Sequence, residues 1–158
     1  MRYLPVVLIY FSCFAACQME KTISLHPYGL PLEMSVPHNA KIMEMDLIVT
    51  KDIEIKTNGY YLQLLTLSVP SDTTISVLEN IRHGVSSDAD FITLIEENEN
   101  GFIFEKKDET GKSVYNFRHL MHLDSIVIMA KASDSMGFSL AQVRKMRKSV
   151  LQAKVKPN

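Results

Sequence analysis

The side chains best suited to nucleophilic or redox chemistry lie near the start of the chain. Cys13 and Cys17 both fall within the stretch FSCFAACQMEK, and no cysteine occurs in the 141 residues that follow. A disulfide needs two cysteines whose α-carbons lie within about 7 Å of each other. Because no cysteine follows Cys17, a disulfide within the chain beyond Cys17 is excluded, and thiol chemistry is confined to the N-terminal end.

Histidine is the next candidate, because its neutral ring is a common metal ligand and general base. The chain has five histidines: His26, His38, His83, His119 and His122. His119 and His122 are three residues apart in a predicted strand, so their side chains point to opposite faces and cannot share one ion. We interpret His119 as a structural residue on an apolar face, and we expect no metal site.

Methionine thioethers could bind Cu(I). Met43 and Met45 share one face of a predicted strand, and His38 precedes them. Three other methionines (Met34, Met129 and Met146) fall at predicted core positions, where methionine serves as a flexible filler. Core packing is the better interpretation, and we expect no cofactor.

The remaining catalytic patterns are absent or better explained by solvent exposure. The chain has no Gly-x-Ser-x-Gly motif and no glycine-rich phosphate loop. Its paired carboxylates lie where a loop enters a strand (Asp88 and Asp90) and around a predicted hairpin turn (Glu96, Glu97 and Glu99). We interpret both groups as solvated charges, and the sequence predicts a protein that is not an enzyme.

The N-terminus has the pattern of a targeting segment. Arg2 is followed by YLPVVLIYFSCFAA, which runs without a charge and ends in two alanines. A positive start, a short apolar run and small residues are typical of a secretory signal peptide. The run is shorter than the roughly 20 apolar residues of a membrane-spanning helix.

Cys17 adds a second feature to this segment. The residues Phe14-Ala15-Ala16-Cys17 resemble the lipobox of bacterial lipoproteins. The resemblance implies that residues 1–16 are a lipoprotein signal peptide that is removed. It also implies that Cys17 carries lipid through its sulfur, with palmitate or a similar acyl chain on its amino group. An ordinary secretory signal is the alternative.

The lipid would determine where the protein resides. Several acyl chains anchor a protein stably, whereas one chain binds only marginally. Gln18 follows the cysteine, and by resemblance to Gram-negative lipoproteins the absence of Asp there favours the outer membrane. We expect a lipid-anchored protein of the bacterial envelope, with its domain either in the periplasm or at the cell surface.

The composition indicates one ordinary globular domain after this segment. The 158 residues are 46% hydrophobic and 22% charged, with a formal net charge of −1. This balance gives no reason to expect nucleic acid as a partner. Residues 17–31 contain two prolines and a glycine without a sustained period, so we expect a tether there and a single α/β domain over residues 32–156.

The periodicity predicts mainly strands. Leu32, Met34 and Val36 alternate in the first one, and Asn58-Gly59 is a hairpin turn between MDLIVTKDIEIKT and YYLQLLTLSVP. The predicted later strands are DFITLIEE, FIFEKK, SVYNFRHLMH and SIVIMAKA, joined by turns at NENG, DETGK and Asp124-Ser125. Short connections favour antiparallel pairing.

Two helices are predicted. The first is capped by Ser71 or Asp72, ends near His83 with Gly84 as its stop, and has the apolar stripe Ile75, Leu78, Ile81 and Val85. The second begins at Ser139 with a capping box to Gln142 and a hydrophobic staple of Phe138 and Val143. Its apolar stripe is Leu140, Val143, Met146, Val150 and Ala153, and Arg144, Lys145, Arg147 and Lys148 are expected on the other side.

These elements predict an α+β fold, an antiparallel β-sheet with helices packed on it. From about Tyr28 to Lys154 the chain resembles the PsbP-like family in its opening YGLPLEMSVP and in its ending of SVYNFRHLMH, a turn, SIVIMAKA and an amphipathic helix. The resemblance implies an α/β/α sandwich. Family members share no catalytic activity and bind or stabilise protein complexes, and no functional residue of the family maps onto this sequence.

The sequence thus predicts a non-catalytic envelope lipoprotein that acts as a protein-binding or accessory module. Its partner would bind at an exposed sheet edge or at the basic helix face of Arg144, Lys145, Arg147 and Lys148, which could also meet anionic head groups. The alternatives are a small-ligand pocket between sheet and helix and, as the least favoured, a hydrolytic enzyme.

Overall fold

The computed structural model describes residues 19–46, 50–67, 74–123 and 126–156. The strands are β1 (Glu20–Ser24), β2 (Leu32–Pro37), β3 (Lys41–Asp46), β4 (Lys51–Thr57), β5 (Tyr60–Leu67), β6 (Phe91–Asn98), β7 (Gly101–Lys107), β8 (Ser113–Leu123), β9 (Ile126–Ala132) and β10 (Lys154–Val155). The helices are α1 (Thr74–Ser86), α2 (Leu140–Leu151) and the short 3-10 helix η1 (His26–Tyr28).

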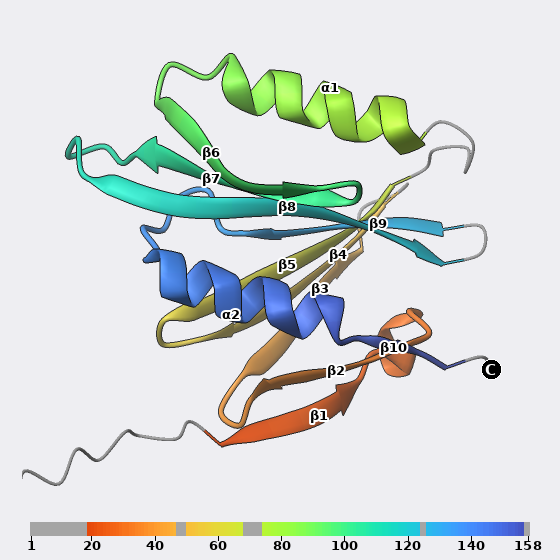
Figure 1. The fold of residues 1–158 in the computed structure, drawn as a ribbon. Coiled ribbons are helices and arrows are strands. Elements are labelled where there is room, and N and C mark those ends of the chain that lie inside the picture. Colours follow the sequence, from red (N-terminus) through yellow and green to blue (C-terminus); the bar gives the residue numbers. More distant parts are fainter. Residues whose placement is uncertain (1–18, 47–49, 68–73, 124–125, 157–158) are drawn as a thin grey trace, which may run out of the picture.

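In this part of the chain the strands form two sheets (Figure 1). Seven strands make an antiparallel sheet in the order β3-β4-β5-β9-β8-β7-β6, and β1, β2 and β10 make a small one. Each strand from β6 to β9 pairs with its neighbour in sequence, as short turns favour. The expected α+β fold with an antiparallel sheet is confirmed.

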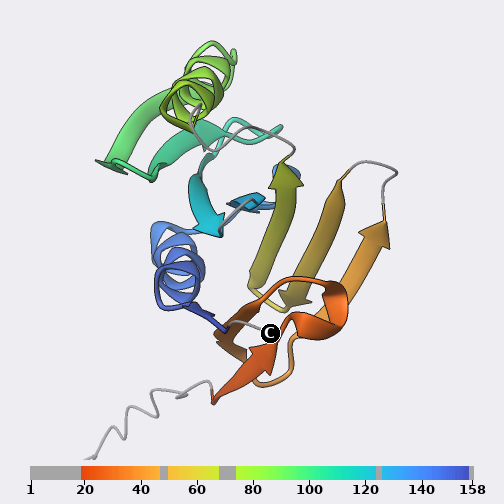
Figure 2. The same ribbon diagram turned by 90° about the vertical axis from the view of Figure 1, so that its right-hand side faces the viewer.

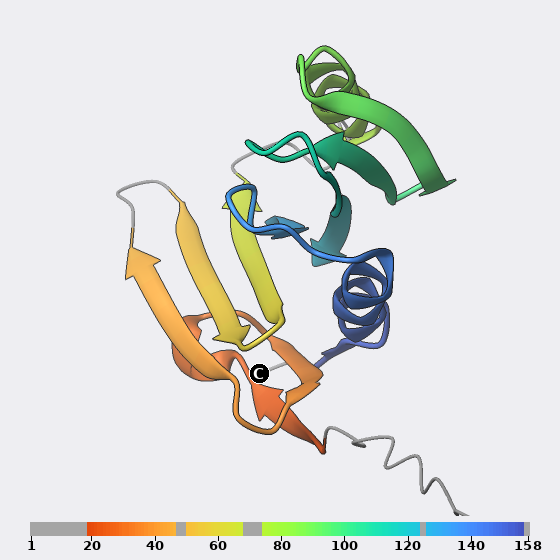
Figure 3. The same cartoon turned by 90° about the vertical axis from the view of Figure 1, so that its left-hand side faces the viewer.

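The two long helices pack on opposite faces of the large sheet. In β7, Phe102 and Phe104 belong to the apolar cluster that contains Leu78 of α1, whereas Ile103 belongs to the cluster that contains Val143 of α2. Successive strand residues point to opposite faces, so the clusters lie on different sides of the sheet. Figures 2 and 3 show α1 over the β6–β8 end, far from β3.

The small sheet shares the α2 side of the large sheet. Leu32, Met34 and Val36 of β2 are each 1% exposed and pack in one cluster with Ile53 and Ile55 of β4. The predicted alternation of this strand is confirmed. The small sheet and α2 therefore cover most of one face of the large sheet.

The expectation of a tether over residues 17–31 is wrong for its described part. Residues 20–24 form β1, which pairs along its whole length with β2. Leu25 and Leu30 are 0% and 1% exposed on either side of η1. Proline and glycine interrupt the periodicity here because the chain turns sharply, and Gly29 takes a positive φ of 74° at the end of η1.

The stretch before the Asn58-Gly59 turn is two strands, not one. β3 ends at Asp46 and β4 begins at Lys51, and the two pair antiparallel. The predicted hairpin turn itself is confirmed, since Thr57 pairs with Tyr60 and Gly59 has a φ of 69°.

The first helix extends past its predicted stop. Gly84 lies inside α1, which continues to Ser86. Gly84 has no positive φ, so it does not form the left-handed cap that ends many helices. No atom lies within 4 Å of the position that a Cβ would take at Gly84. The expected caps Ser71 and Asp72 lie outside the described residues, as does the turn at Asp124-Ser125.

The start of the second helix is as predicted. Ser139 Oγ accepts a hydrogen bond from the Gln142 backbone N–H at 3.3 Å, and the Gln142 side chain accepts one from the Ser139 N–H at 2.8 Å. Phe138 and Val143 are 2% and 0% exposed in the same cluster. Both the capping box and the apolar residues of the staple are in place.

Within the described residues no helix is long and apolar enough to cross a membrane.

Candidate functional site

The predicted lipidation site and the start of the domain are adjacent in sequence. Cys17 and Gln18 lie outside the described residues, and Met19 is the first residue that the structure describes. Its side chain is 73% exposed, and its backbone oxygen accepts a hydrogen bond from the His38 N–H at 2.8 Å. Met19, two residues after Cys17, is therefore already hydrogen-bonded into the domain.

The five histidines are dispersed. His38, His83 and His122 are exposed, His26 is half-buried, and only His119 is buried. Among the described residues no three His, Cys, Asp or Glu side chains gather so that they could hold a metal ion.

His119 lies between the large sheet and α2. Its side chain is 5% exposed, and its Nδ1 atom has no hydrogen-bond partner among the described groups. Burial, and then the positive charge of Arg147, lower the pKa of His119 from 6.5 to about 4. The imidazole is neutral at neutral pH and packs as part of the core.

The basic residues of α2 do not form the expected exposed face. Arg147 is buried, with its side chain 8% exposed, and donates to Glu96 at 3.1 Å. Arg144 donates to the other oxygen of Glu96 at 2.7 Å. The Nζ atom of Lys145 lies 4.0 Å from Oε1 of Glu20, and Lys148 is exposed. Three of the four residues of the predicted patch therefore pair with carboxylates of the protein itself.

The interpretation of Glu96, Glu97 and Glu99 as solvated charges is wrong for Glu96 alone. Glu96 and Glu97 lie in β6 and point to opposite faces: Glu96 binds α2, whereas Glu97 is exposed and pairs with Arg82 of α1. Glu99 is exposed at the turn, as predicted. The sequence held one signal for this arrangement, because Arg144 and Arg147 are three residues apart and so share a helix face. Asp88 and Asp90 lie exposed before β6, as predicted.

One accessible binding feature is the outer edge of β3. Among the described residues no strand pairs with this side of β3, which lies at the border of the sheet in Figures 2 and 3. Its register with β4 is regular over six residues, whereas the opposite edge strand β6 has two irregularities. Met43 and Met45 are 47% and 44% exposed. Natural edges are usually blunted by bulges or similar devices.

The hairpin geometry identifies which backbone groups of β3 face outward. In a two-residue hairpin the residues flanking the turn, here Thr57 and Tyr60, form a hydrogen-bonded pair. Alternation then directs the odd residues of β4 toward β5, and the Lys51 N–H indeed donates to Thr66 Oγ1 of β5 at 2.7 Å. The even residues of β4 face β3, so the N–H and C=O groups of Ile42 and Glu44 point away from the sheet.

The sheet face beside this edge is polar. Gln63 donates to Asp52 Oδ2 at 2.6 Å, and the Tyr61 hydroxyl donates to Glu54. This hydrogen bond lowers the pKa of Glu54, and burial together with the same bond raises the pKa of Tyr61. Tyr61 is therefore held as a neutral donor and not as a phenolate.

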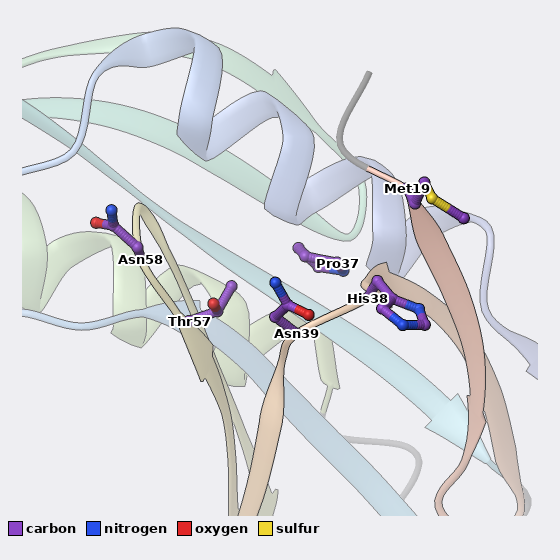
Figure 4. A pocket seen from close by; sticks show the side chains of 6 residues that line it. All are labelled: Met19, Pro37, His38, Asn39, Thr57 and Asn58. Atoms are coloured by element: carbon purple, nitrogen blue, oxygen red, sulfur yellow. The ribbon is translucent and has the colours of Figure 1, made fainter. Parts of the chain in front are cut away.

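The pockets described by the structure lie on the surface. One of about 370 Å³ is lined by Met19, Pro37, His38, Asn39, Thr57 and Asn58 (Figure 4). A second pocket lies on the outer side of the small sheet, beside Thr22 and Ser35. A third lies at the β7–β8 turn, beside Asp108. Between the large sheet and α2, the alternative location predicted for a ligand pocket, Phe117, Val143 and Met146 belong to one buried apolar cluster.

Comparison with known proteins adds no relative. No family model, no curated protein and no solved structure matches this chain.

Proposed function

We propose that this chain is a lipid-anchored envelope protein whose domain binds a protein partner without catalysis. The partner adds an extended segment as a strand to the outer edge of β3. The regular, unbulged edge of β3 carries this proposal, because it offers unpaired backbone groups flanked by the exposed side chains of Met43 and Met45.

The edge is a better binding surface than the basic helix. Arg144 and Arg147 already neutralise Glu96, so α2 has less free charge than the sequence indicates. Strand addition takes its affinity from main-chain hydrogen bonds and its specificity from alternate side chains. Methionine suits such a surface, because its flexible thioether adapts to different partner side chains.

Removing one outward backbone N–H of β3 tests whether a partner strand pairs with this edge. Glu44→Pro removes an outward N–H, and proline is tolerated on edge strands. Glu44→Ala is the matched control, because it also loses the ion pair with Lys51 but keeps the N–H. A photocrosslinking residue at Met45 in the full chain is expected to capture one partner in the Glu44→Ala variant, and to lose it in the Glu44→Pro variant.

Two results would contradict strand addition. One is a crosslinked product that persists unchanged in the Glu44→Pro variant. The other is a product obtained equally from a crosslinker at Glu79, an exposed residue of α1 on the far part of the molecule.

The anchor has a separate test. Cys17→Ala removes the sulfur that would carry the lipid, so the protein is expected to leave the membrane fraction or to remain unprocessed. Unchanged processing and fractionation would refute lipidation at Cys17. Fractionation of the inner and outer membranes tests the outer-membrane location proposed from Gln18.

We also infer that the fold is an α/β/α sandwich of the PsbP-like kind. Helices on opposite faces of an antiparallel sheet support this inference. An experimental structure that superposes on no PsbP-like domain would refute the relationship and leave the α+β fold unaffected.

A further inference from the structure

We propose that one end of the domain rests directly on the phospholipid head groups. This end comprises Met19, the β2–β3 turn (residues 37–41) and the β4–β5 turn (residues 56–59), and we call it the membrane-proximal end. The proposal rests on the lipid anchor at Cys17 that is part of the proposed function.

The first argument is the length of chain between lipid and fold. β1 begins at Glu20, three residues after Cys17. A fully extended chain spans at most about 3.6 Å per residue, so Glu20 lies within about 11 Å of the α-carbon of Cys17. Because the expected tether does not exist over residues 20–31, the domain cannot move far from the bilayer.

The second argument is that the β2–β3 turn is hydrogen-bonded to residues 19–21, the part of the described chain that lies next to Cys17. The His38 N–H donates to the Met19 oxygen, and Glu20 pairs with Pro37 across the small sheet. The Lys21 ammonium donates to the Ala40 oxygen at 3.2 Å. The β2–β3 turn is therefore carried by the same strand pair that receives the anchor, and the pocket of Figure 4 joins it to the β4–β5 turn.

The third argument is the charge of this end. Residues 37–41 and 56–59 include Lys41, Lys56 and His38 but no carboxylate. Lys41 and Lys56 lie directly opposite each other on β3 and β4. Lys56 pairs with Glu54 at 3.0 Å, whereas Lys41 is exposed at the start of β3. Lys41 is therefore the cation that an anionic head group would meet first, since lysines near an anionic lipid surface are attracted to it.

Met19 supplies an apolar contact at the same place. At 73% exposed it is the most exposed of the large hydrophobic side chains in the described chain. A flexible, unbranched side chain of this kind can enter the boundary between head groups and acyl chains.

The orientation has a consequence for the proposed partner site. β3 starts at the membrane-proximal end with Lys41 and runs away from it to Asp46. The free edge of β3 then stands upright on the bilayer, and an added strand would run along the membrane normal without obstruction by lipid.

The chain has no tryptophan, so one introduced tryptophan reports on one position. We would place it at Met19 or at His38, both exposed at the membrane-proximal end. The matched control is Val155→Trp, at a position that is 54% exposed in the wild type and pairs with Leu32. Leu32 is at the other end of β2 from Pro37, about 17 Å away by strand rise.

Each lipidated full-chain variant is reconstituted into vesicles of phosphatidylcholine and phosphatidylglycerol with a nitroxide on the head group. The tryptophans at 19 and 38 are expected to lose most of their emission, and that at 155 to keep most of it. Replacing the phosphatidylglycerol by phosphatidylcholine is expected to weaken the quenching at 38. Flotation with the vesicles is measured on the same samples.

The outcomes separate the two proposals. Variants that float but show equal quenching at all three positions, or none at 19 and 38, overturn the orientation and leave the anchor intact. Variants that do not float overturn the anchor and, with it, the orientation. Two independent reporters guard against a local disturbance at either one.

Discussion

His119 shows how burial determines the state of a titratable residue in this domain. Sequence reasoning assigned it to an apolar strand face, and it lies there with Nδ1 unpartnered and the Arg147 guanidinium nearby. Both features oppose protonation of the ring. The consequence is a dependence of stability on pH.

We expect His119 to make the fold sensitive to mild acid. Above pH 6.5 the ring is neutral in the folded and unfolded states. Between pH 6.5 and about 4 only the unfolded chain binds the proton, so stability falls as the pH falls, by about 2 kcal/mol between pH 7 and pH 5. Urea unfolding at both values checks this.

The His119→Gln variant is expected to lose most of this pH-dependent difference. His122→Gln is the matched control, because His122 is an exposed residue of the same strand and its replacement should leave the difference unchanged. An unaltered difference in the His119 variant would assign the pH dependence to other groups.

Among the elements, β6 is linked to both long helices, because two adjacent carboxylates of this strand bind arginines on opposite faces of the sheet. Glu96 receives Arg144 and Arg147 from α2, and Glu97 receives Arg82 from α1. The Arg147–Glu96 and Arg82–Glu97 pairs differ in how far their side chains are exposed. Arg147 is 8% exposed at its side chain, whereas Arg82 and Glu97 are 36% and 39% exposed.

This difference predicts unequal costs for the same substitution at neighbouring positions. Glu96→Gln leaves the buried Arg147 without its anion, and because Glu96 itself is 35% exposed the expected cost is about 1–3 kcal/mol of unfolding free energy. Glu97→Gln breaks an exposed pair and should cost less than about 0.5 kcal/mol. Denaturant unfolding of both variants measures the two values, and equal costs would show that burial of Arg147 does not matter.

In the whole molecule, residues 20–31 belong to the folded domain and are not a flexible tether. They contribute β1, η1 and the fully buried Leu25 and Leu30 to the layer that covers β4 and β5. The domain is therefore larger at its N-terminal side than the sequence indicates, because it includes residues 20–31.

Leu25→Ala tests this larger domain. Leucine-to-alanine changes at fully buried sites typically cost about 2–5 kcal/mol, and Leu25 is 0% exposed. Met19→Ala, in the same segment but exposed, should change stability by less than about 0.5 kcal/mol. Thermal or denaturant unfolding decides, and a tolerated Leu25→Ala would restore the interpretation of the segment as a tether.

Local patterns account for the elements that were predicted correctly. The capping box of Ser139, the Asn58-Gly59 turn and the alternation from Leu32 to Val36 depend on residues close in sequence. The errors have a different origin. Gly84 does not end α1, and the tether forms a strand, because contacts with distant segments outweigh weak local preferences.

Periodicity, turn chemistry and composition are local properties, and they predict the antiparallel α+β class, both long helices, most of the strands and the absence of cysteine beyond Cys17. The fold adds three facts that these properties leave open. Arg144 and Arg147 bind Glu96, no described strand pairs with the outer side of β3, and residues 20–31 belong to the domain. Each of these depends on which segments lie side by side. The spacing of Arg144 and Arg147 indicates a shared helix face, but it does not identify a partner some 50 positions away, such as Glu96.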